Sequence, residues 1–171
     1  MADNYLEKRM ADYANGRLSR HCAPKSSGAR RPFAGIPYPQ HTVLIIGADT
    51  AAGADMLRAF AEAGCRVRFT ASDKTAGAYL SQNAGGQFYP MNPAEAMRAL
   101  CDKGERPDTV IVCDGSAPAV PQGTRLIIIS ESEASVPGSI IIAGSDTAQA
   151  ARVALMISHP SASMPPQTIR V

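Results

Sequence analysis

The residues best suited to chemistry form a turn of small side chains after the apolar run Thr42–Ile46. A pyrophosphate can approach a backbone only where side chains are small, and a following helix offers free N–H groups and a favourable dipole. Gly47 and Gly53 meet this demand, whereas Ala51 adds a methyl group where a middle glycine would leave space. The turn therefore predicts a phosphate site made of Gly47, Asp49, Thr50, Ala51 and Gly53. The alternative is a tight connection that binds nothing.

Other reactive side chains are scattered along the chain. Four cysteines (Cys22, Cys65, Cys101 and Cys113) lie far apart without a C-x-x-C pair, which predicts free thiols and neither a zinc site nor a disulfide framework. The three histidines are isolated in the sequence, and we expect no metal site. The last tyrosine is Tyr89 and the last lysine is Lys103, so the second half of the chain lacks two common proton-transfer side chains.

Length and charge restrict the class of protein. A chain of 171 residues, 45% of them hydrophobic, can bury one good core, and the net charge of +2 gives no case for binding nucleic acid or a membrane surface. No apolar run approaches the roughly 18 residues of a membrane span, and the first residues do not read as a signal peptide. We expect a cytoplasmic protein.

Composition divides the chain into three parts. Residues 1–18 carry apolar side chains at helical spacing and predict an N-terminal helix that needs a partner surface. Residues 19–40 are rich in Ser, Gly, Pro and basic side chains, which indicates a linker: either a mobile tail or an electrostatic arm for an acidic partner. Residues 41–171 alternate strands with helices and form the predicted Rossmann-like domain.

The alternation predicts an α/β fold with a three-layer, doubly wound and mostly parallel sheet. Expected strands are 42–46, 66–70, 87–89, 109–113, 125–129, 139–143 and 167–171, and expected helices are 51–63, 73–81, 93–104 and 146–159. We expect strand order 3-2-1-4-5, with 139–143 beside the fifth strand. Eight linking residues permit either an antiparallel hairpin or an extended parallel crossover without a helix, and we favour the parallel arrangement. Ligands of such sheets bind at the carboxyl ends of the strands.

Several segments together resemble the short-chain dehydrogenase/reductase family. Ile46–Gly53 is similar to its T-G-x-x-x-G-x-G turn, with alanine at the middle glycine. Val112–Gly115 stands where the family has N-N-A-G, Arg125–Ser130 resembles its fifth strand, and Gln167–Val171 is similar to its closing Q-T-I-R-V. The resemblance covers residues 42–171 apart from one gap. It implies a Rossmann fold and an NAD or NADP site. Because alanine replaces the middle glycine of the turn, we expect the binding of either cofactor to be weak or lost.

The resemblance also implies further cofactor contacts. Ala71 replaces the aspartate that favours NAD, and Ser72 stands where an NADP-reading arginine is common. Asp73 could reach a ribose hydroxyl, Asn92 lies where the family often has an aspartate near the adenine, and Gly115 is the glycine kept from N-N-A-G. Asp73 and Asn92 are equally typical of helix N-caps, and we favour the cap for Asp73.

The gap in the resemblance concerns catalysis. Family members follow the fifth strand and its serine, here Ser130, with a helix that carries Y-x-x-x-K. Here only residues 131–138 precede the next apolar run, too few for a helical crossover. The general acid and its lysine would be missing with that helix, so Ser130 is the one catalytic candidate. It is a weak nucleophile without a base, and a structural serine is the simpler interpretation.

Three functions remain open at this stage. The preferred one is a pseudoenzyme: a non-catalytic NAD(P)-binding Rossmann module that acts by binding a dinucleotide, by forming a homo-oligomer, or by joining a full-length reductase. The alternative is an active NAD(P)-dependent oxidoreductase whose proton donor is non-standard, for instance Ser130 with Glu131, or comes from a partner chain. A purely structural or interaction role without any nucleotide is the third.

Overall fold

The computed structural model describes residues 40–114, 117–131 and 136–171. The predicted N-terminal helix, nearly all of the predicted linker, and Gly115 lie outside the described residues. The strands are β1 (Thr42–Ile46), β2 (Arg66–Thr70), β3 (Gln87–Phe88), β4 (Thr109–Val112), β5 (Arg125–Ser130), β6 (Ile140–Ala143) and β7 (Thr168–Arg170). The helices are α2 (Ala51–Glu62), α3 (Lys74–Asn83), α4 (Pro93–Asp102) and α5 (Thr147–Ser158).

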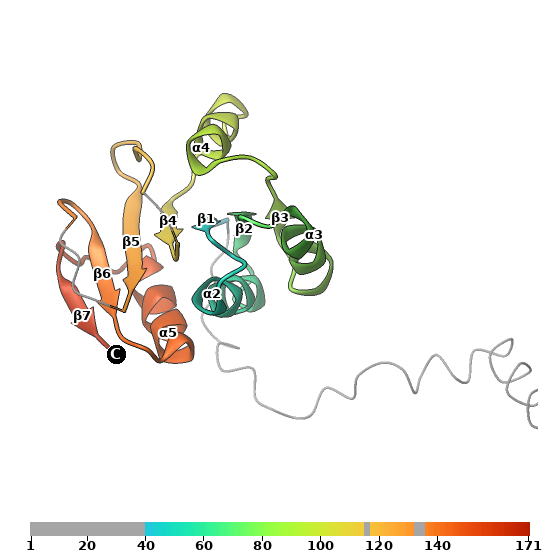
Figure 1. Ribbon diagram of the computed structural model, residues 1–171. Helices are drawn as coiled ribbons and strands as arrows, with labels where there is room; N and C mark the ends of the chain where they lie inside the picture. The colour runs from blue at the N-terminus through green and yellow to red at the C-terminus, as the bar shows by residue number, and fades with distance from the viewer. Residues whose placement is uncertain (1–39, 115–116, 132–135) are drawn as a thin grey trace, which may run out of the picture. The chain divides into compact units, whose positions relative to one another are not determined.

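The strands form one sheet in the order β3-β2-β1-β4-β5-β6-β7, shown in Figure 1. Every neighbouring pair is parallel, including β5 and β6, where Ile127 is opposite Ile140 and Ser130 is opposite Ala143. The predicted fold class and strand order are therefore confirmed, as is the parallel direction of β6. The terminal strand also forms, at the edge beside β6.

Helices cover the two faces of the sheet unequally. All residues of β1, β4 and β6 are buried, as expected for apolar strands covered on both sides. Helices α2 and α5 pack side by side on one face, and α4 lies on the opposite face (Figure 1). On the α4 face, Ala96, Met97 and Leu100 join a buried cluster that extends across β1, β4, β5 and β6.

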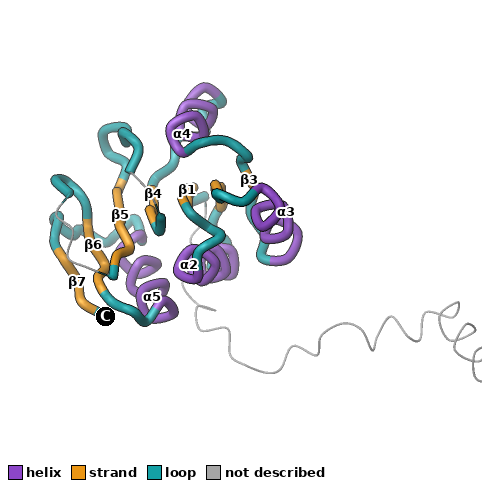
Figure 2. Tube along the Cα trace, in the orientation of Figure 1, coloured by secondary structure: helices purple, strands orange, loops and turns teal. Residues whose placement is uncertain are grey.

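Two crossover connections contain no helix in their described residues. Residues 113–124 join β4 to β5, and residues 131–139 join β5 to β6; Figure 2 shows both as loops with undescribed parts. The sequence predicts no helix in either segment, although only the second was identified there as a missing crossover helix. Pro118 and Pro121 explain the first, because proline interrupts helical hydrogen bonding. Ala117, Val120 and Val136 pack against the cluster in place of helices.

Local chemistry accounts for the helix starts. Each helix begins with an N-cap whose side chain accepts a hydrogen bond from a backbone N–H of the first turn. The pairs are Thr50 with Gly53, Asp73 with Thr75, Asn92 with Glu95, and Asp146 with Gln149. The helix at α3 runs two residues further than predicted, because Gly77 lies under the Phe88 ring and serves packing without ending the helix. The strands β3 and β4 end one residue earlier than predicted.

Candidate functional site

The turn between β1 and α2 is built on two glycines that the backbone needs. Gly47 has φ +76°, and a Cβ there would lie 2.6 Å from the Cβ of Asp114 at the end of β4. A Cβ on Gly53 would lie 2.6 Å from the Cα of Ala48 and closer still to the carbonyl oxygen of Gly47. Both distances are too short for any side chain. The outer glycines therefore serve the close packing of the strand, the turn and the helix.

The middle position of the turn differs from the outer ones. Ala51, the first residue of α2, is exposed and its methyl group meets no such packing demand. Thr50 caps the helix, with its hydroxyl donating to the Gly47 carbonyl at 2.8 Å and accepting from the Gly53 N–H at 3.0 Å. The first-turn N–H groups of Ala51 and Ala52 have no intrahelical acceptor, so the helix offers them to a ligand.

Two cavities flank this turn at the carboxyl ends of the strands. The first, of about 710 Å³, extends from Gly47 past Thr70–Ser72 to the start of α4. The second, of about 630 Å³, lies between the start of α2, the ends of β4 and β5, and the start of α5. Asp114 and Ala117 line both. The chain leaves β1 towards β2 on one side of it, whereas β4 lies on the other side of β1. The turn after β1 is therefore at the topological switch point, where such sheets bind ligands.

The Asp49 carboxylate joins the turn to the loop after β2. Its Oδ2 accepts from the backbone N–H of Ser72 at 2.9 Å and from that of Asp73 at 3.0 Å. Its Oδ1 is buried and has no hydrogen-bond donor in the described structure. The Asp73 side chain caps α3 by accepting from the Thr75 N–H at 2.7 Å. The cap predicted for Asp73 is therefore confirmed.

Asn92 also acts as a cap, with its Oδ1 accepting from the Glu95 N–H at 2.9 Å. It nevertheless lines the first cavity, together with Ser72 and Lys74. The structure thus brings the predicted residues Gly47, Ser72 and Asn92 to one cavity. Thr50 and Ala51 line the other cavity, and Gly115 lies outside the described residues.

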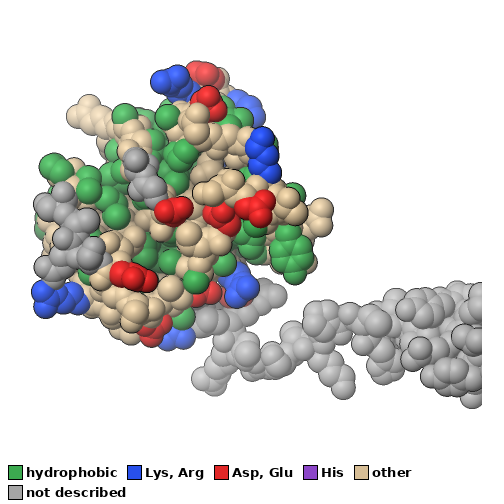
Figure 3. All heavy atoms as spheres, viewed as in Figure 1, with side chains coloured by type: hydrophobic (Ala, Val, Ile, Leu, Met, Phe, Trp, Pro, Cys, Tyr) green, Lys and Arg blue, Asp and Glu red, His purple; other side chains and the backbone are tan. Residues whose placement is uncertain are grey.

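The site carries more acidic than basic charge. Asp114 lines both cavities and Glu131 lines the second, whereas Lys74 is the one cationic side chain among the described residues that line either cavity. Figure 3 shows acidic side chains gathered along the middle of the visible face. These carboxylates would repel a phosphate group, whereas the helix N–H groups and Lys74 would attract one.

The second cavity holds the catalytic candidate. Ser130 and Glu131 line it at the end of β5, and the Ser130 carbonyl accepts from the Gly144 N–H at 3.2 Å. Cys113 lines it too, but burial, with a smaller effect of the Asp114 carboxylate, raises the pKa of its thiol to about 12. Cys113 is therefore protonated at neutral pH and is a poor nucleophile.

The last tyrosine and the last lysine lie elsewhere and contact each other. Tyr89 is 4% exposed within the cluster under α4, and its hydroxyl is buried without a partner in the described structure. The Lys103 ammonium lies 5.4 Å from the centre of the Tyr89 ring, a cation–π contact. Tyr89 and Lys103 line neither cavity beside the turn, so they are not placed to act there as a proton donor and its lysine.

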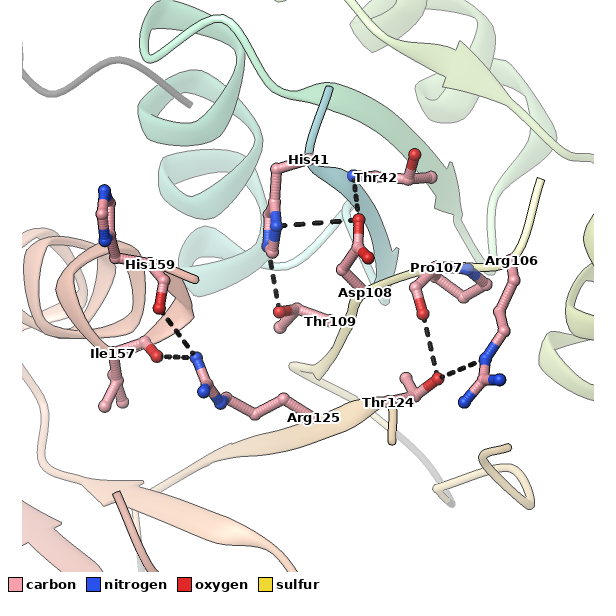
Figure 4. A network of polar contacts seen from close by, with 10 residues as sticks. All are labelled: His41, Thr42, Arg106, Pro107, Asp108, Thr109, Thr124, Arg125, Ile157 and His159. Atoms are coloured by element: carbon pink, nitrogen blue, oxygen red, sulfur yellow. Dashed lines mark hydrogen bonds and ion pairs between the residues drawn. The ribbon is translucent and has the colours of Figure 1, made fainter. Parts of the chain in front are cut away.

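A polar network occupies the opposite ends of the strands (Figure 4). His41 Nε2 is 3.1 Å from Thr109 Oγ1, and His41 Nδ1 is 3.6 Å from Asp108 Oδ2. This sequence of hydroxyl, imidazole and carboxylate resembles a nucleophilic relay, but Thr109 is fully buried and no substrate could reach it. Arg125 donates to the carbonyl group of Ile157, at the end of α5, and to that of Ala162, in the segment after the helix. We therefore interpret the network as structural.

Comparison with known proteins places this geometry in a fold class. No protein-family model and no curated protein matches the sequence. Solved structures of short-chain dehydrogenases/reductases do match the fold. BdcA, solved in complex with NADPH, is 18% identical with a TM-score of 0.58, over 76% of this chain and 93% of BdcA. A second structure of BdcA, from E. coli, is 20% identical with a TM-score of 0.56, over 77% of this chain and 96% of that one.

A 3-oxoacyl-[acyl-carrier protein] reductase from Brucella melitensis, solved with bound NAD, is also similar. It is 14% identical with a TM-score of 0.59, over 78% of this chain and 90% of the reductase. These likenesses show that the chain has the Rossmann-like fold of short-chain dehydrogenases/reductases. Among the described residues, no group of three or more His, Cys, Asp and Glu side chains could hold a metal ion. No helix in that part of the chain is long and apolar enough to cross a membrane.

Sequence reasoning missed two features of the site. It did not foresee that Asp49 binds the loop after β2, because the acceptor and its donors are far apart in the sequence. It also did not foresee that Asp114 lies against Gly47. The sequence signal for Asp114 was its position in the segment that matches the family's N-N-A-G, where the family has alanine and this chain has aspartate.

Proposed function

We propose that this protein is a dinucleotide-binding Rossmann module without a classical proton-transfer apparatus of its own. The observation that carries the proposal is the pair of cavities on either side of the Gly47–Gly53 turn, at the switch point of the sheet. The adenosine half of the ligand would occupy the first cavity and the nicotinamide half the second. The pyrophosphate would lie at the amino end of α2, against Ala51 and Ala52.

We propose that the protein does not turn over a substrate because of the residues that line the second cavity. Among the described residues, its ionisable groups are the carboxylates of Asp114 and Glu131 and the protonated thiol of Cys113. A forming alkoxide needs a proton donor within hydrogen-bond reach, and an ionised carboxylate has no proton to give. The short β5–β6 connection supplies neither tyrosine nor lysine.

The module would act through association as well as through its ligand. Loop residues cover the β5 side chains on the α4 face, where the crossover helices of a doubly wound sheet usually lie. We propose that a second copy or a full-length reductase joins the protein at this face. The mass in solution, measured by light scattering with and without NAD⁺, tests this part separately.

Calorimetric titration with NAD(H) and NADP(H) tests the ligand. Ala51→Leu places a larger side chain at an exposed first-turn position and should abolish binding while leaving the fold intact. The matched control is Ala148→Leu, because Ala148 is an exposed first-turn alanine of α5 outside both cavities. Absence of binding by the unaltered protein, or equal binding by both variants, contradicts the proposal.

A reductase screen addresses the alternative activity. Ser130 and Glu131 lie together on the second cavity, which is the observation that favours an oxidoreductase with a non-standard donor. Under our proposal NAD(P)H is bound but not consumed with carbonyl substrates. Turnover that disappears in Ser130→Ala would instead establish the oxidoreductase.

A further inference from the structure

The Asp49 carboxylate already fills the anion position in front of α3. Two consecutive backbone N–H groups, those of Ser72 and Asp73, donate to its Oδ2 at 2.9 and 3.0 Å. These residues immediately precede the helix Lys74–Asn83, and in its first turn the Thr75 N–H donates to the Asp73 carboxylate. A helix amino terminus of this kind would otherwise receive a phosphate.

The position of this carboxylate relative to the first cavity matters for the ligand. Ser72 and Ala71 line the cavity together with Gly47, so the loop that Asp49 fixes forms the wall where the adenosine ribose of a dinucleotide would lie. Asp49 Oδ1 is buried, and no donor in the described structure reaches it. Two backbone dipoles therefore compensate the negative charge only in part, and the Asp49 side chain is partly buried.

We infer that Asp49 makes the site selective for a dinucleotide whose adenosine ribose carries no phosphate. This inference rests on the proposed function and assigns the choice of ligand to a residue of the glycine turn. A 2′-phosphate would find both N–H donors occupied and a like charge behind them, whereas free ribose hydroxyls carry no charge to be repelled. Asp49 is a positioning and selectivity residue that acts through the loop it holds.

Lys74 supplies the cation of the same cavity and must be considered beside Asp49. Its side chain lines the first cavity, so it attracts the pyrophosphate of any dinucleotide and would attract a 2′-phosphate as well. The loop before it carries two carboxylates, that of the helix cap Asp73 and that of Asp49, which is bound to the loop. Replacement of Lys74 by alanine should therefore weaken the binding of both dinucleotides, and that of NADP⁺ at least as much as that of NAD⁺.

The test compares NAD⁺ and NADP⁺ by calorimetry for the unaltered protein, Asp49→Asn and Asp102→Asn. The Asp49→Asn substitution keeps an oxygen acceptor for the two N–H groups and removes the charge, and Asp102 is an exposed aspartate that lines neither cavity. We expect NAD⁺ to bind about tenfold more tightly than NADP⁺, a ratio that one repelling charge can produce. The ratio should fall to about threefold or less in Asp49→Asn and stay unchanged in Asp102→Asn.

The outcomes separate this inference from the proposed function. Equal or tighter binding of NADP⁺ by the unaltered protein overturns the selectivity and leaves the dinucleotide site in place. An unchanged ratio in a folded Asp49→Asn variant also overturns it. Binding of neither dinucleotide overturns both proposals. Should Asp49→Asn fail to fold, competition between adenosine 5′-monophosphate and adenosine 2′,5′-bisphosphate on the unaltered protein decides, since only the second carries the repelled phosphate.

Discussion

Replacement of Gly53 by alanine should destabilise the protein because the fold has no room for a methyl group at this position. A Cβ would lie 2.6 Å from the Cα of Ala48 and closer to the Gly47 carbonyl, and both neighbours are backbone atoms. Backbone cannot rotate away as a side chain can, so the turn and α2 must separate. That movement would also disturb the proposed pyrophosphate site.

The expected loss of stability follows from two opposing effects. Alanine in place of glycine inside a helix is worth about 1 kcal/mol in favour of folding. Overpacking typically costs about 1–3 kcal/mol, and we expect about 3 kcal/mol here because the obstacle is backbone. The net loss in the free energy of unfolding is about 2 kcal/mol, which lowers the Tm of a chain of this size by about 4–8 °C.

Thermal and urea unfolding followed by circular dichroism measure this loss. Gly64→Ala is the matched control, because Gly64 has φ +84° and no atom within 4 Å of a built Cβ. The Gly64→Ala variant should lose only about 1–2 kcal/mol in the free energy of unfolding, the cost of placing alanine in a left-handed backbone conformation. If Gly53→Ala is as stable as the unaltered protein, or loses less than Gly64→Ala, the packing argument is refuted and a ligand would be the reason for Gly53.

Three further predictions concern the site and the network below it. Ala51→Gly should tighten dinucleotide binding about tenfold in calorimetry, because it removes the methyl group from the pyrophosphate position; unchanged affinity would contradict the placement. Burial lowers the pKa of His41 below 6.5, outweighing the effect of Asp108, so the unfolded chain takes up its proton first. The free energy of unfolding should therefore be fully present above about pH 6.5 and fall as the pH drops below it, and urea titrations should show a flatter slope in His41→Gln. Cys113, with its thiol pKa of about 12, should react with iodoacetamide at about pH 8 far more slowly than the exposed Cys101, as peptide mass mapping can measure.

Much of the fold could be predicted because its signals are local. The start of α4 is predicted by three residues within four positions: Asn92, Pro93 and Glu95. In the structure the Asn92 side chain accepts from the Glu95 N–H, as expected of an N-cap. Buried parallel strands read directly as apolar runs such as Thr42–Ile46. The family resemblance then supplied the strand order, which no local pattern contains.

The parts that could not be predicted depend on contacts between distant residues. Nothing around Asp49 indicates that its carboxylate binds the N–H groups of Ser72 and Asp73. The pairing of Lys103 with Tyr89 likewise depends on how α4 lies over the sheet. The described part of residues 113–124 also lacks a crossover helix, and Pro118 and Pro121 are the local signal against one.

The loops that join β4, β5 and β6 also bear on how quickly the chain reaches its native state. Parallel strands ordinarily meet only after a long intervening segment has been ordered, which makes them slow to assemble. Here β4, β5 and β6 are joined by connections of about a dozen residues or fewer. The entropic cost of closing a loop increases with its length, so these connections cost less than usual crossovers. We therefore expect this side of the sheet to form early in folding, before β1 to β3 and their helices dock onto it.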